Sequence, residues 1–197
     1  MYTIKKSTII NNINDPVWKS AKDIKIETIN WEEFAFKPNM IAKLLYSDFG
    51  LHIKLTTDEK NLIATKRKQN EQVCEDSCME FFFRPNENNP HYINFEFNPF
   101  GTMYSAIRTS RKDAHYPVEN KYYFNVISDV TENEWSLFFT VPFEFIDKNF
   151  GGHTDKIYGN IYKCGGQTEH YLSLFPISSE NPDFHRPEFF GEFILEK

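Results

Sequence analysis

The chain has 197 residues, of which 40% are hydrophobic and 25% charged, a balance typical of a soluble globular protein with one sizeable core. The net charge of -6 argues against a nucleic-acid-binding protein, which needs a basic surface. We expect no membrane segment, because no apolar run approaches the required length. Met1–Ile10 lacks the features of a signal peptide, so the chain reads as cytoplasmic; a secreted protein trimmed of its signal would read the same.

Short strand-like runs separated by turn residues dominate the chain and predict an all-β fold. The first runs are Ile24–Ile29, Met40–Tyr46 and Leu51–Thr56, and the last two flank Ser47–Gly50, a hairpin turn sequence. Further strands are predicted over Cys78–Arg84, His91–Asn98, Thr102–Arg108, Tyr122–Ser128, Glu134–Val141, Ile157–Cys164, His170–Phe175 and Phe189–Leu195.

Helical signals are few. Asn14–Trp18 resembles a capped turn with proline in the first helical position, and Pro142–Lys148 is long enough for one short helix. With no composition break, residues 1–197 are predicted to form a single-domain β-sandwich, jelly-roll or immunoglobulin-like, of about ten antiparallel strands with one or two short helices.

Polar groups among aromatic residues mark two neighbouring predicted strands as a candidate binding surface. Glu80 precedes three phenylalanines, and Asn94, Glu96 and Asn98 alternate with Phe95 and Phe97, so the polar side chains share one face of the second strand. Carboxylates and amides beside flat rings suit a polyhydroxylated ligand. A structural role for Glu80, paired with Arg108 or a backbone N–H, and a solvated role for Glu96 are the alternatives.

Three other polar residues join the candidate ligand-binding set. Arg108 has the fork geometry to bind adjacent hydroxyls, or else pairs with Glu80 or Glu96. Lys163 projects opposite to its two neighbours, and a structural ion pair with a carboxylate is the favoured role. His170 belongs to a polar cluster near the C-terminus, where Asp183–Pro187 is predicted to fold as a tight, internally bonded loop rather than to contact a ligand.

The three cysteines, Cys74, Cys78 and Cys164, do not suggest a disulfide framework, because their number is odd. Cys78 and Cys164 both lie in strand-like runs and can meet across the core as buried thiols. The spacing of Cys74 and Cys78 matches the usual zinc-ligand spacings poorly, so the sequence does not predict a zinc site.

Several segments together resemble the family 9 carbohydrate-binding modules, in order and spacing, over nearly the whole chain. The resemblance implies a non-catalytic β-sandwich that binds sugars, often attached to glycoside hydrolases, and in some members structural calcium. The matching segments are Asp76–Phe82, Asn94–Gly101, Asn160–Gly165, His170–Ser173, Asp183–Glu188 and Phe190–Gly191.

The chain departs from the family at the sugar-stacking residues. Sugar-binding members carry one tryptophan shortly before the Asp-Ser motif and another after the segment that matches His170. Cys74 and Leu174 stand at these positions here, so the predicted ligand site lacks the tryptophan clamp. Each aromatic anchor contributes on the order of 1–3 kcal/mol through its buried area. Tyrosines such as Tyr92, Tyr104 and Tyr122 are the candidates to replace it.

These observations predict non-catalytic binding of a mono- or oligosaccharide, plant polysaccharides being one source, with no catalytic residues and no certain cofactor. One alternative is a structural or sensory sandwich that has lost its ligand. Another is a glycoside hydrolase using Glu80 and Glu96, which needs carboxylates about 5 Å apart. Asp15, Asp48 and Asp129 lie in predicted loops and can supply oxygen ligands to a structural calcium ion, but no EF-hand pattern occurs. The oligomeric state is left open.

Overall fold

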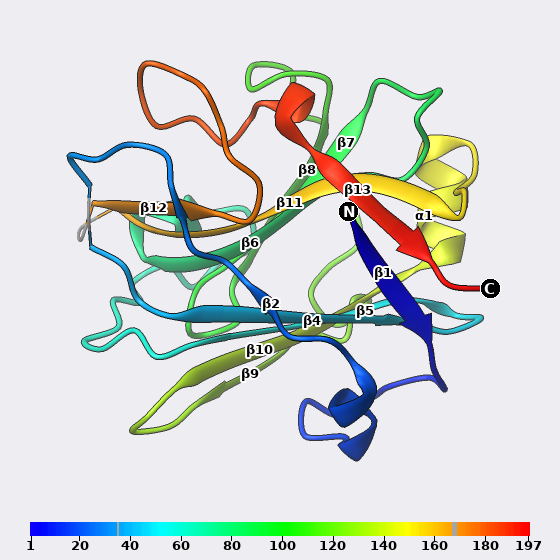
Figure 1. The fold of residues 1–197 in the computed structure, drawn as a ribbon, viewed down its shortest axis with the longest axis horizontal. Coiled ribbons are helices and arrows are strands. Elements are labelled where there is room, and N and C mark those ends of the chain that lie inside the picture. The colour runs from blue at the N-terminus through cyan, green and yellow to red at the C-terminus, as the bar shows by residue number, and fades with distance from the viewer. Residues whose placement is uncertain (35, 167–168) are drawn as a thin grey trace.

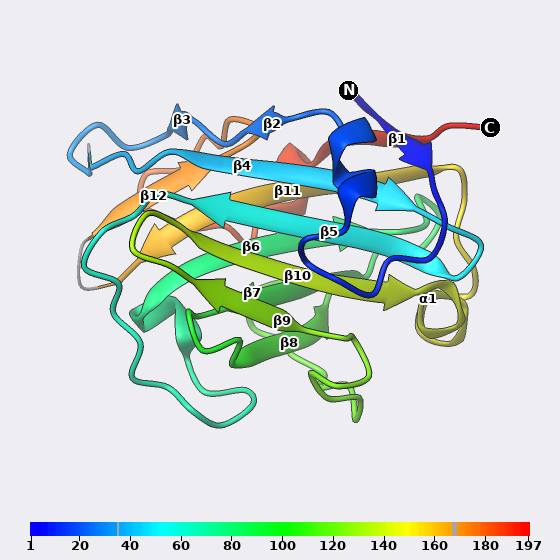
Figure 2. The ribbon, with the colours of Figure 1, turned by 90° about the horizontal axis from the view of Figure 1, so that it is seen from below.

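The fold is seen in a computed structural model that describes residues 1–34, 36–166 and 169–197. Two β-sheet layers face each other (Figures 1 and 2). The first sheet runs in the order β8-β7-β6-β11-β13, with β12 paired to β11 and the short β3 paired to β12. Its strands are β3 (Thr28–Ile29), β6 (Ser77–Arg84), β7 (Tyr92–Phe97), β8 (Met103–Arg108), β11 (Lys156–Gly165), β12 (His170–Ser173) and β13 (Gly191–Leu195).

The second sheet runs in the order β4-β5-β10-β9, with the short β2 paired to β4. One strand, β1 (Tyr2–Lys6), joins the two layers, because it pairs in parallel with β13 in the first sheet and with β4 in the second. The strands of the second sheet are β2 (Ile24–Lys25), β4 (Met40–Tyr46), β5 (Gly50–Thr57), β9 (Ile127–Val130) and β10 (Trp135–Pro142).

The predicted β-sandwich is confirmed, with thirteen strands among the described residues rather than about ten. Met40–Tyr46 is β4, and the predicted hairpin into β5 forms, with Tyr46 opposite Leu51. Gly50 is required at this turn, because a Cβ atom there would lie 2.3 Å from the carbonyl oxygen of Val141. The parallel pairs made by β1 are an exception to the predicted antiparallel arrangement.

One strand was missed by the sequence analysis, and two predicted strands need correction. Tyr2–Lys6 was not predicted, because only Ile4 of this strand is buried and its lysines face solvent. Ile24–Ile29 divides into β2 and β3, which pair with different strands, β4 and β12. The predicted strand Tyr122–Ser128 begins only at Ile127, because residues 120–126 form turns in which Asn125 has a φ of 48°.

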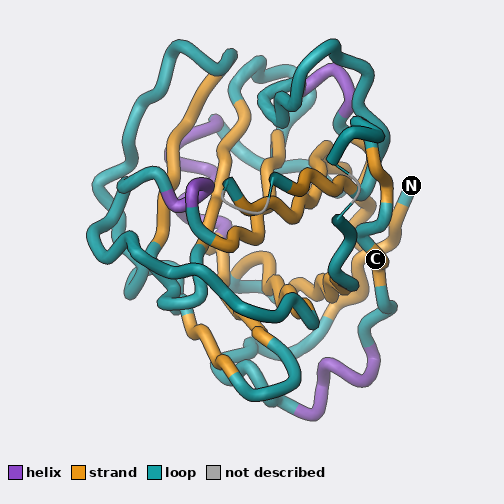
Figure 3. The backbone as a smooth tube through the Cα atoms, turned by 90° about the vertical axis from the view of Figure 1, so that its left-hand side faces the viewer, coloured by secondary structure: helices purple, strands orange, loops and turns teal. Residues whose placement is uncertain are grey.

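Helical structure is limited to short segments, and loops cover much of the end of the molecule seen in Figure 3. The predicted short helix is α1 (Phe143–Phe150), which ends at the left-handed Gly151. The predicted capped turn is the 3-10 helix Pro16–Ser20, in which the Asp15 side chain accepts from Val17 N. Val73–Glu75 and Pro187–Phe189 form two further 3-10 turns. No helix of the described residues is long and apolar enough to span a membrane.

The alternation of side chains along β6 explains why this strand is buried on both faces. Met79, Phe81 and Phe83 point between the two sheets and join the main core. Phe82 points to the outer face, where it belongs to a second buried cluster that also includes Trp31 from a distant loop. Full burial of a phenylalanine contributes about 1.5–3 kcal/mol. Next to this second cluster, part of the outer face of the sheet lines a cleft.

Candidate functional site

A cleft of about 580 Å³ lies on the outer face of the first sheet. Its floor comes from neighbouring strands: Glu80 from β6, Glu96 from β7, Tyr104 and Arg108 from β8, and Cys164 from β11. Loops and strand ends supply the walls. The wall residues include Gln72, Cys74, Glu75, Arg111, Lys112, Ala114, Tyr116, Gly166, Tyr171 and Pro182–His185.

Two carboxyl groups meet at this floor. Glu80 and Glu96 are directly opposite in the antiparallel β6–β7 pair, a position that sets Cβ atoms about 4.5–5.5 Å apart. Their exposed fractions are only 2% and 5%. Asn94 Nδ2 donates to Glu96 Oε1 at 2.8 Å, and Cys164 Sγ donates to Glu80 Oε1 at 3.0 Å. Neither carboxyl takes part in any ion pair found among the described residues.

The surroundings of these carboxyl groups favour their protonated forms. Burial raises the pKa of Glu80 to about 7. Burial and the adjacent charge of Glu80 raise the pKa of Glu96 well above its usual value. Near neutral pH the floor of the cleft therefore retains at least one carboxyl proton. Such a pair both donates and accepts hydrogen bonds, as a hydroxyl group requires.

Arg108 uses its donors to build the cleft. Its Nε donates to Asn94 Oδ1 at 3.0 Å, its Nη1 to the Arg111 carbonyl at 2.6 Å, and its Nη2 to the Tyr104 hydroxyl at 2.6 Å. Asn94 lies beneath the cleft, where it connects Arg108 to Glu96. Of the predicted residues, Glu80, Glu96 and Arg108 thus line the cleft, and Asn94 supports them without lining it.

Lys163 and His170 lie on the other side of the sheet from the cleft. Lys163 Nζ is 2.7 Å from Glu59 Oε2, and both side chains are completely buried. Its neighbours Tyr162 and Cys164 point to the outer face, so alternation sends Lys163 inward. His170 Nε2 is 3.0 Å from Lys163 Nζ, and burial, followed by the charge of Lys163, lowers the pKa of His170 to about 3. The structural ion pair predicted for Lys163 is present, and neither residue lines the cleft.

Asn98 also lies outside the cleft, at the end of β7. Its Nδ2 donates to Asp76 Oδ2 and to the Lys66 carbonyl, both at 2.8 Å. Asp76 in turn accepts from Thr65, and Ser77 Oγ donates to Glu59 at 3.0 Å. The Asp-Ser segment and Asn98 therefore fasten the loop that follows β5 to the first sheet.

Aromatic residues that the sequence did not single out also line the cleft. Tyr116 and Tyr171 come from a loop and from β12, and Tyr104, a predicted candidate, stands at the cleft with its hydroxyl 3.3 Å from that of Tyr116. Of the two positions aligned with the absent tryptophans, Cys74 lines the wall, whereas Leu174 packs into the main core. Tyr171 and Leu172 are adjacent in β12, so their side chains point to opposite faces of the sheet. Because Leu172 packs into the main core, this alternation could have identified Tyr171 as a residue of the outer face.

The other two tyrosine candidates have different positions. The Tyr92 hydroxyl lies 3.0 Å from Nδ1 of His185, a residue that lines the cleft, and Tyr92 itself is buried. Tyr122 is 81% exposed and belongs to a different surface. The predicted loop Asp183–Pro187 is internally bonded, since His185 N donates to Asp183 Oδ1 at 3.1 Å. It nevertheless forms one wall of the cleft, with Asp183 paired to Arg111 at 2.9 Å.

His185 predicts a pH dependence of stability. Burial and the charges of Arg108 and Arg111 lower the pKa of His185 to about 3, from an ordinary value of 6.5. As pH falls below 6.5, the unfolded chain binds a proton that the folded chain does not, so the folded state loses stability. We expect His185→Asn to remove roughly 1–3 kcal/mol of the loss between pH 7 and pH 4. Urea unfolding of both proteins across this range is the measurement; parallel curves would refute the assignment.

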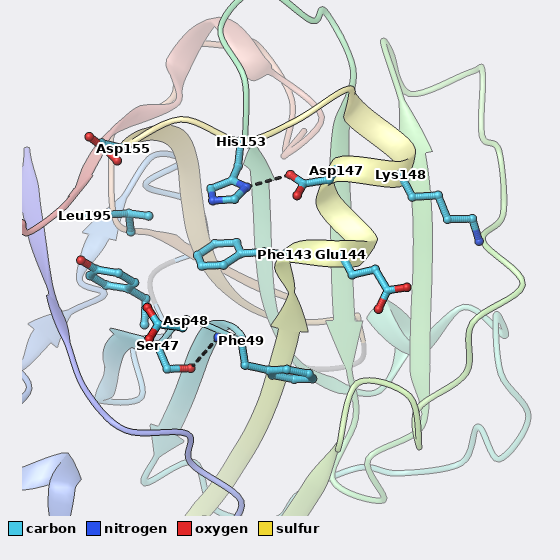
Figure 4. A pocket seen from close by; sticks show the side chains of 11 residues that line it. Ser47, Asp48, Phe49, Phe143, Glu144, Asp147, Lys148, His153, Asp155 and Leu195 are labelled. Carbon is cyan, nitrogen blue, oxygen red and sulfur yellow. Dashed lines mark hydrogen bonds and ion pairs between the residues drawn. The ribbon is translucent and has the colours of Figure 1, made fainter.

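A second hollow, of about 830 Å³, lies between α1 and the β4–β5 turn (Figure 4). The rings of His153 and Phe143 stack there at 3.9 Å, and His153 Nδ1 lies 2.8 Å from Asp147 Oδ1. Asp48 and Asp155 form exposed ion pairs with Lys6 and Lys197. The acidic residues that line this hollow are all exposed and several are already paired, so its described residues include no buried carboxyl pair like that of the cleft. It provides residues for control variants.

The loop aspartates considered for calcium do not come together. Asp15 caps a 3-10 helix, Asp48 pairs with Lys6, and Asp129 lies on β9. Within the described residues, the one compact group of three or more potential His, Cys, Asp or Glu ligands contains none of them. The residues therefore do not fit a shared calcium site.

The family model for carbohydrate-binding family 9 matches residues 17–195. The chain belongs to carbohydrate-binding family 9. The predicted resemblance is thereby confirmed. No curated protein sequence matches the chain significantly.

Solved structures resemble this family 9 fold over nearly the whole chain. A "putative carbohydrate-binding protein" from Bacteroides uniformis is 24% identical, with a TM-score of 0.87 and 98% of each chain covered. A family 9 module from Caldicellulosiruptor kristjanssonii in complex with glucose is 10% identical, with a TM-score of 0.69 and coverage of 98% of this chain and 94% of that one. A family 9 module from Caldicellulosiruptor kristjanssonii in complex with cellotriose is also 10% identical, with a TM-score of 0.68 and coverage of 99% of this chain and 93% of that one. These likenesses concern the fold.

Proposed function

We propose that this family 9 chain binds a mono- or oligosaccharide, without cleaving it, in the cleft above Glu80 and Glu96. The observation that carries the proposal is the pair of opposed, buried carboxyl groups at the floor of an open cleft. Their retained proton lets them donate to one sugar hydroxyl and accept from another. No cationic side chain among the described residues neutralises them through an ion pair, so the carboxyl oxygens that do not accept from neighbouring side chains are available to a ligand.

The walls supply the apolar part of sugar recognition. The rings of Tyr104, Tyr116 and Tyr171 line the cleft and offer surfaces for the C–H faces of a sugar ring. They take the place of the tryptophan clamp, but a phenol ring buries less area than an indole ring. We therefore expect weaker binding than a two-tryptophan clamp would give.

Glucose and cello-oligosaccharides are the first ligands to test, because glucose and cellotriose occupy the two Caldicellulosiruptor kristjanssonii complexes. Calorimetric titration with glucose, cellobiose, cellotriose and xylobiose tests the proposal. Saturable heat with at least one sugar supports it. Heats equal to those of buffer across a broad glycan panel would reject it in favour of a structural or sensory sandwich without a sugar ligand.

The alternative function is glycoside hydrolysis. Glu80 and Glu96 are adjacent, and retaining glycosidases use two neighbouring carboxyl groups. Such an enzyme needs one of the pair ionised as the nucleophile. Here burial raises the pKa of Glu80 to about 7 and that of Glu96 well above its usual value, which disfavours an ionised nucleophile in mildly acid solution. We expect no nitrophenol release from a panel of aryl glycosides, and Glu80-dependent release would overturn the non-catalytic assignment.

A further inference from the structure

Two cysteines and a glutamate converge at one end of the cleft floor. Cys78 on β6 and Cys164 on β11 are directly opposite in the antiparallel pair, and Glu80 follows Cys78 by two residues on the same face. The two Sγ atoms and a Glu80 carboxyl oxygen all lie within 4.8 Å of one another. All three side chains are buried, and both thiols are free. Cys78 and Cys164 thus meet as buried thiols, but as neighbours on the outer face of one sheet and not across the core between the sheets.

The spacing of these atoms fits a small tetrahedral ion. Zinc binds sulfur at about 2.3 Å and carboxylate oxygen at about 2.0–2.2 Å, so two ligand atoms on one zinc lie roughly 3.5–3.8 Å apart. The three groups already meet within 4.8 Å, and Cys164 Sγ lies 3.0 Å from Glu80 Oε1. Small side-chain rotations are enough to place all three on one ion. The antiparallel register holds the strands that carry them.

The lack of a cationic partner for Glu80 and Glu96 within the described chain also favours a bound metal ion. Glu80 is 2% exposed and Glu96 is 5% exposed, yet no salt bridge in the described parts of the chain reaches either one. Buried carboxyl groups usually pair with a cation or coordinate a metal. Arg108, the cationic side chain that lines this floor beside them, donates to Asn94, Tyr104 and the Arg111 carbonyl instead. A dication bound at Glu80 would take the place of a carboxyl proton as the positive partner of this buried pair.

We propose that Cys78, Cys164 and Glu80 bind one zinc ion at the floor of the cleft, with the fourth coordination position open to the cleft. Glu80 and Cys164 line the cleft and Cys78 lies behind them, which leaves the cleft side for water or a ligand oxygen. Two thiolates select a thiophilic ion such as zinc over calcium or magnesium. On binding, the two thiol protons and any proton held by Glu80 pass to solvent, so each zinc releases two to three protons.

Metal titration of the reduced, EDTA-stripped protein under anaerobic conditions tests this site. Cobalt(II) is the spectroscopic probe, because thiolate ligands give it charge-transfer bands and tetrahedral geometry gives it intense visible bands. We expect one equivalent of cobalt to produce both signals in the wild-type protein, and one equivalent of zinc to abolish them. Absence of the thiolate bands, or release of fewer than two protons per zinc, would overturn the proposal without requiring any variant.

Matched variants locate the site. Cys78→Ala and Cys164→Ala should each weaken zinc binding by about 100-fold or more, because losing one of three ligands costs more than losing an outer-shell partner, which costs about 10–100-fold. Cys74→Ala is the control, since Cys74 also lines the cleft but lies outside the compact group. Thermal unfolding and circular dichroism identify any variant that does not fold. Equal loss in Cys74→Ala, or unchanged zinc binding in folded Cys78→Ala, would contradict the assignment.

The zinc site and the sugar proposal share Glu80 but can be separated. Sugar titrations are carried out with and without EDTA, and zinc titrations without sugar. Zinc uptake without any sugar binding would support the metal site alone. Sugar binding in EDTA without any zinc uptake would reject the metal site and leave the sugar proposal standing.

Discussion

Lys163→Met is expected to lower the free energy of unfolding by about 3–5 kcal/mol, because it leaves the carboxylate of Glu59 buried without its partner. Lys163 Nζ and Glu59 Oε2 are 2.7 Å apart, and neither side chain is exposed. The Ser77 hydroxyl, which donates to Glu59 at 3.0 Å, is too weak a partner to replace an ammonium group. Urea denaturation of the variant and the wild-type protein measures the difference.

The matched control is Lys156→Met, which breaks the ion pair between Lys156 and Glu192. That pair has a similar distance, 3.1 Å, but its side chains are 42% and 39% exposed, so we expect a change below about 1 kcal/mol. A second substitution, Glu59→Gln in the Lys163→Met background, should recover part of the loss, because it removes the unpaired charge. Equal effects of Lys163→Met and Lys156→Met would show that burial does not set the cost.

Glu80→Ala is expected to weaken sugar binding by roughly ten- to a hundredfold, which corresponds to about 1.5–3 kcal/mol for a hydrogen bond to a charged group. The substitution removes the carboxyl group of β6 from the cleft floor and leaves Glu96 without its neighbour. The variant should fold, because Glu80 makes no ion pair among the described residues and its negative charge disfavours ionisation of Glu96. Calorimetric or NMR titration with cellotriose, with EDTA present, gives the affinities.

Glu144→Ala is the control for this substitution. Glu144 is an exposed acidic residue that lines the second hollow (Figure 4), so the same change of side chain is made at a competing place on the surface. We expect its affinity to equal that of the wild-type protein. A loss of affinity in Glu144→Ala with none in Glu80→Ala would place the sugar in the hollow between α1 and the β4–β5 turn.

Strand alternation made much of the fold and part of the cleft predictable. The hairpin into β5 follows from its turn residues and from the apolar face of Leu51, Ile53 and Leu55. The succession of strand-like runs predicted that Glu80 and Glu96 lie on neighbouring strands, and their direct opposition in register is a finding of the structure. Lys163 follows the alternation rule as well. It lies between Tyr162 and Cys164, whose side chains are on the outer face, so its own side chain points to the inner face.

The walls of the cleft could not be predicted in the same way. Tyr116 and His185 lie in loops that approach the sheet from distant parts of the chain, and no periodic pattern relates a loop residue to a sheet face. Asn98 shares a face with Asn94 and Glu96, but the strand ends before it, and its side chain shapes the following turn. Strand ends and long-range loop contacts therefore limited the prediction of the site more than residue chemistry did.

An NMR titration of the isotope-labelled protein with cellotriose tests the central claim most directly. The cleft above Glu80 and Glu96 predicts saturable shifts of resonances from Tyr104, Tyr116 and Tyr171, with those from Phe143 and His153 unchanged. Shifts confined to Phe143 and His153, or no shifts with any sugar of a broad panel, would contradict it.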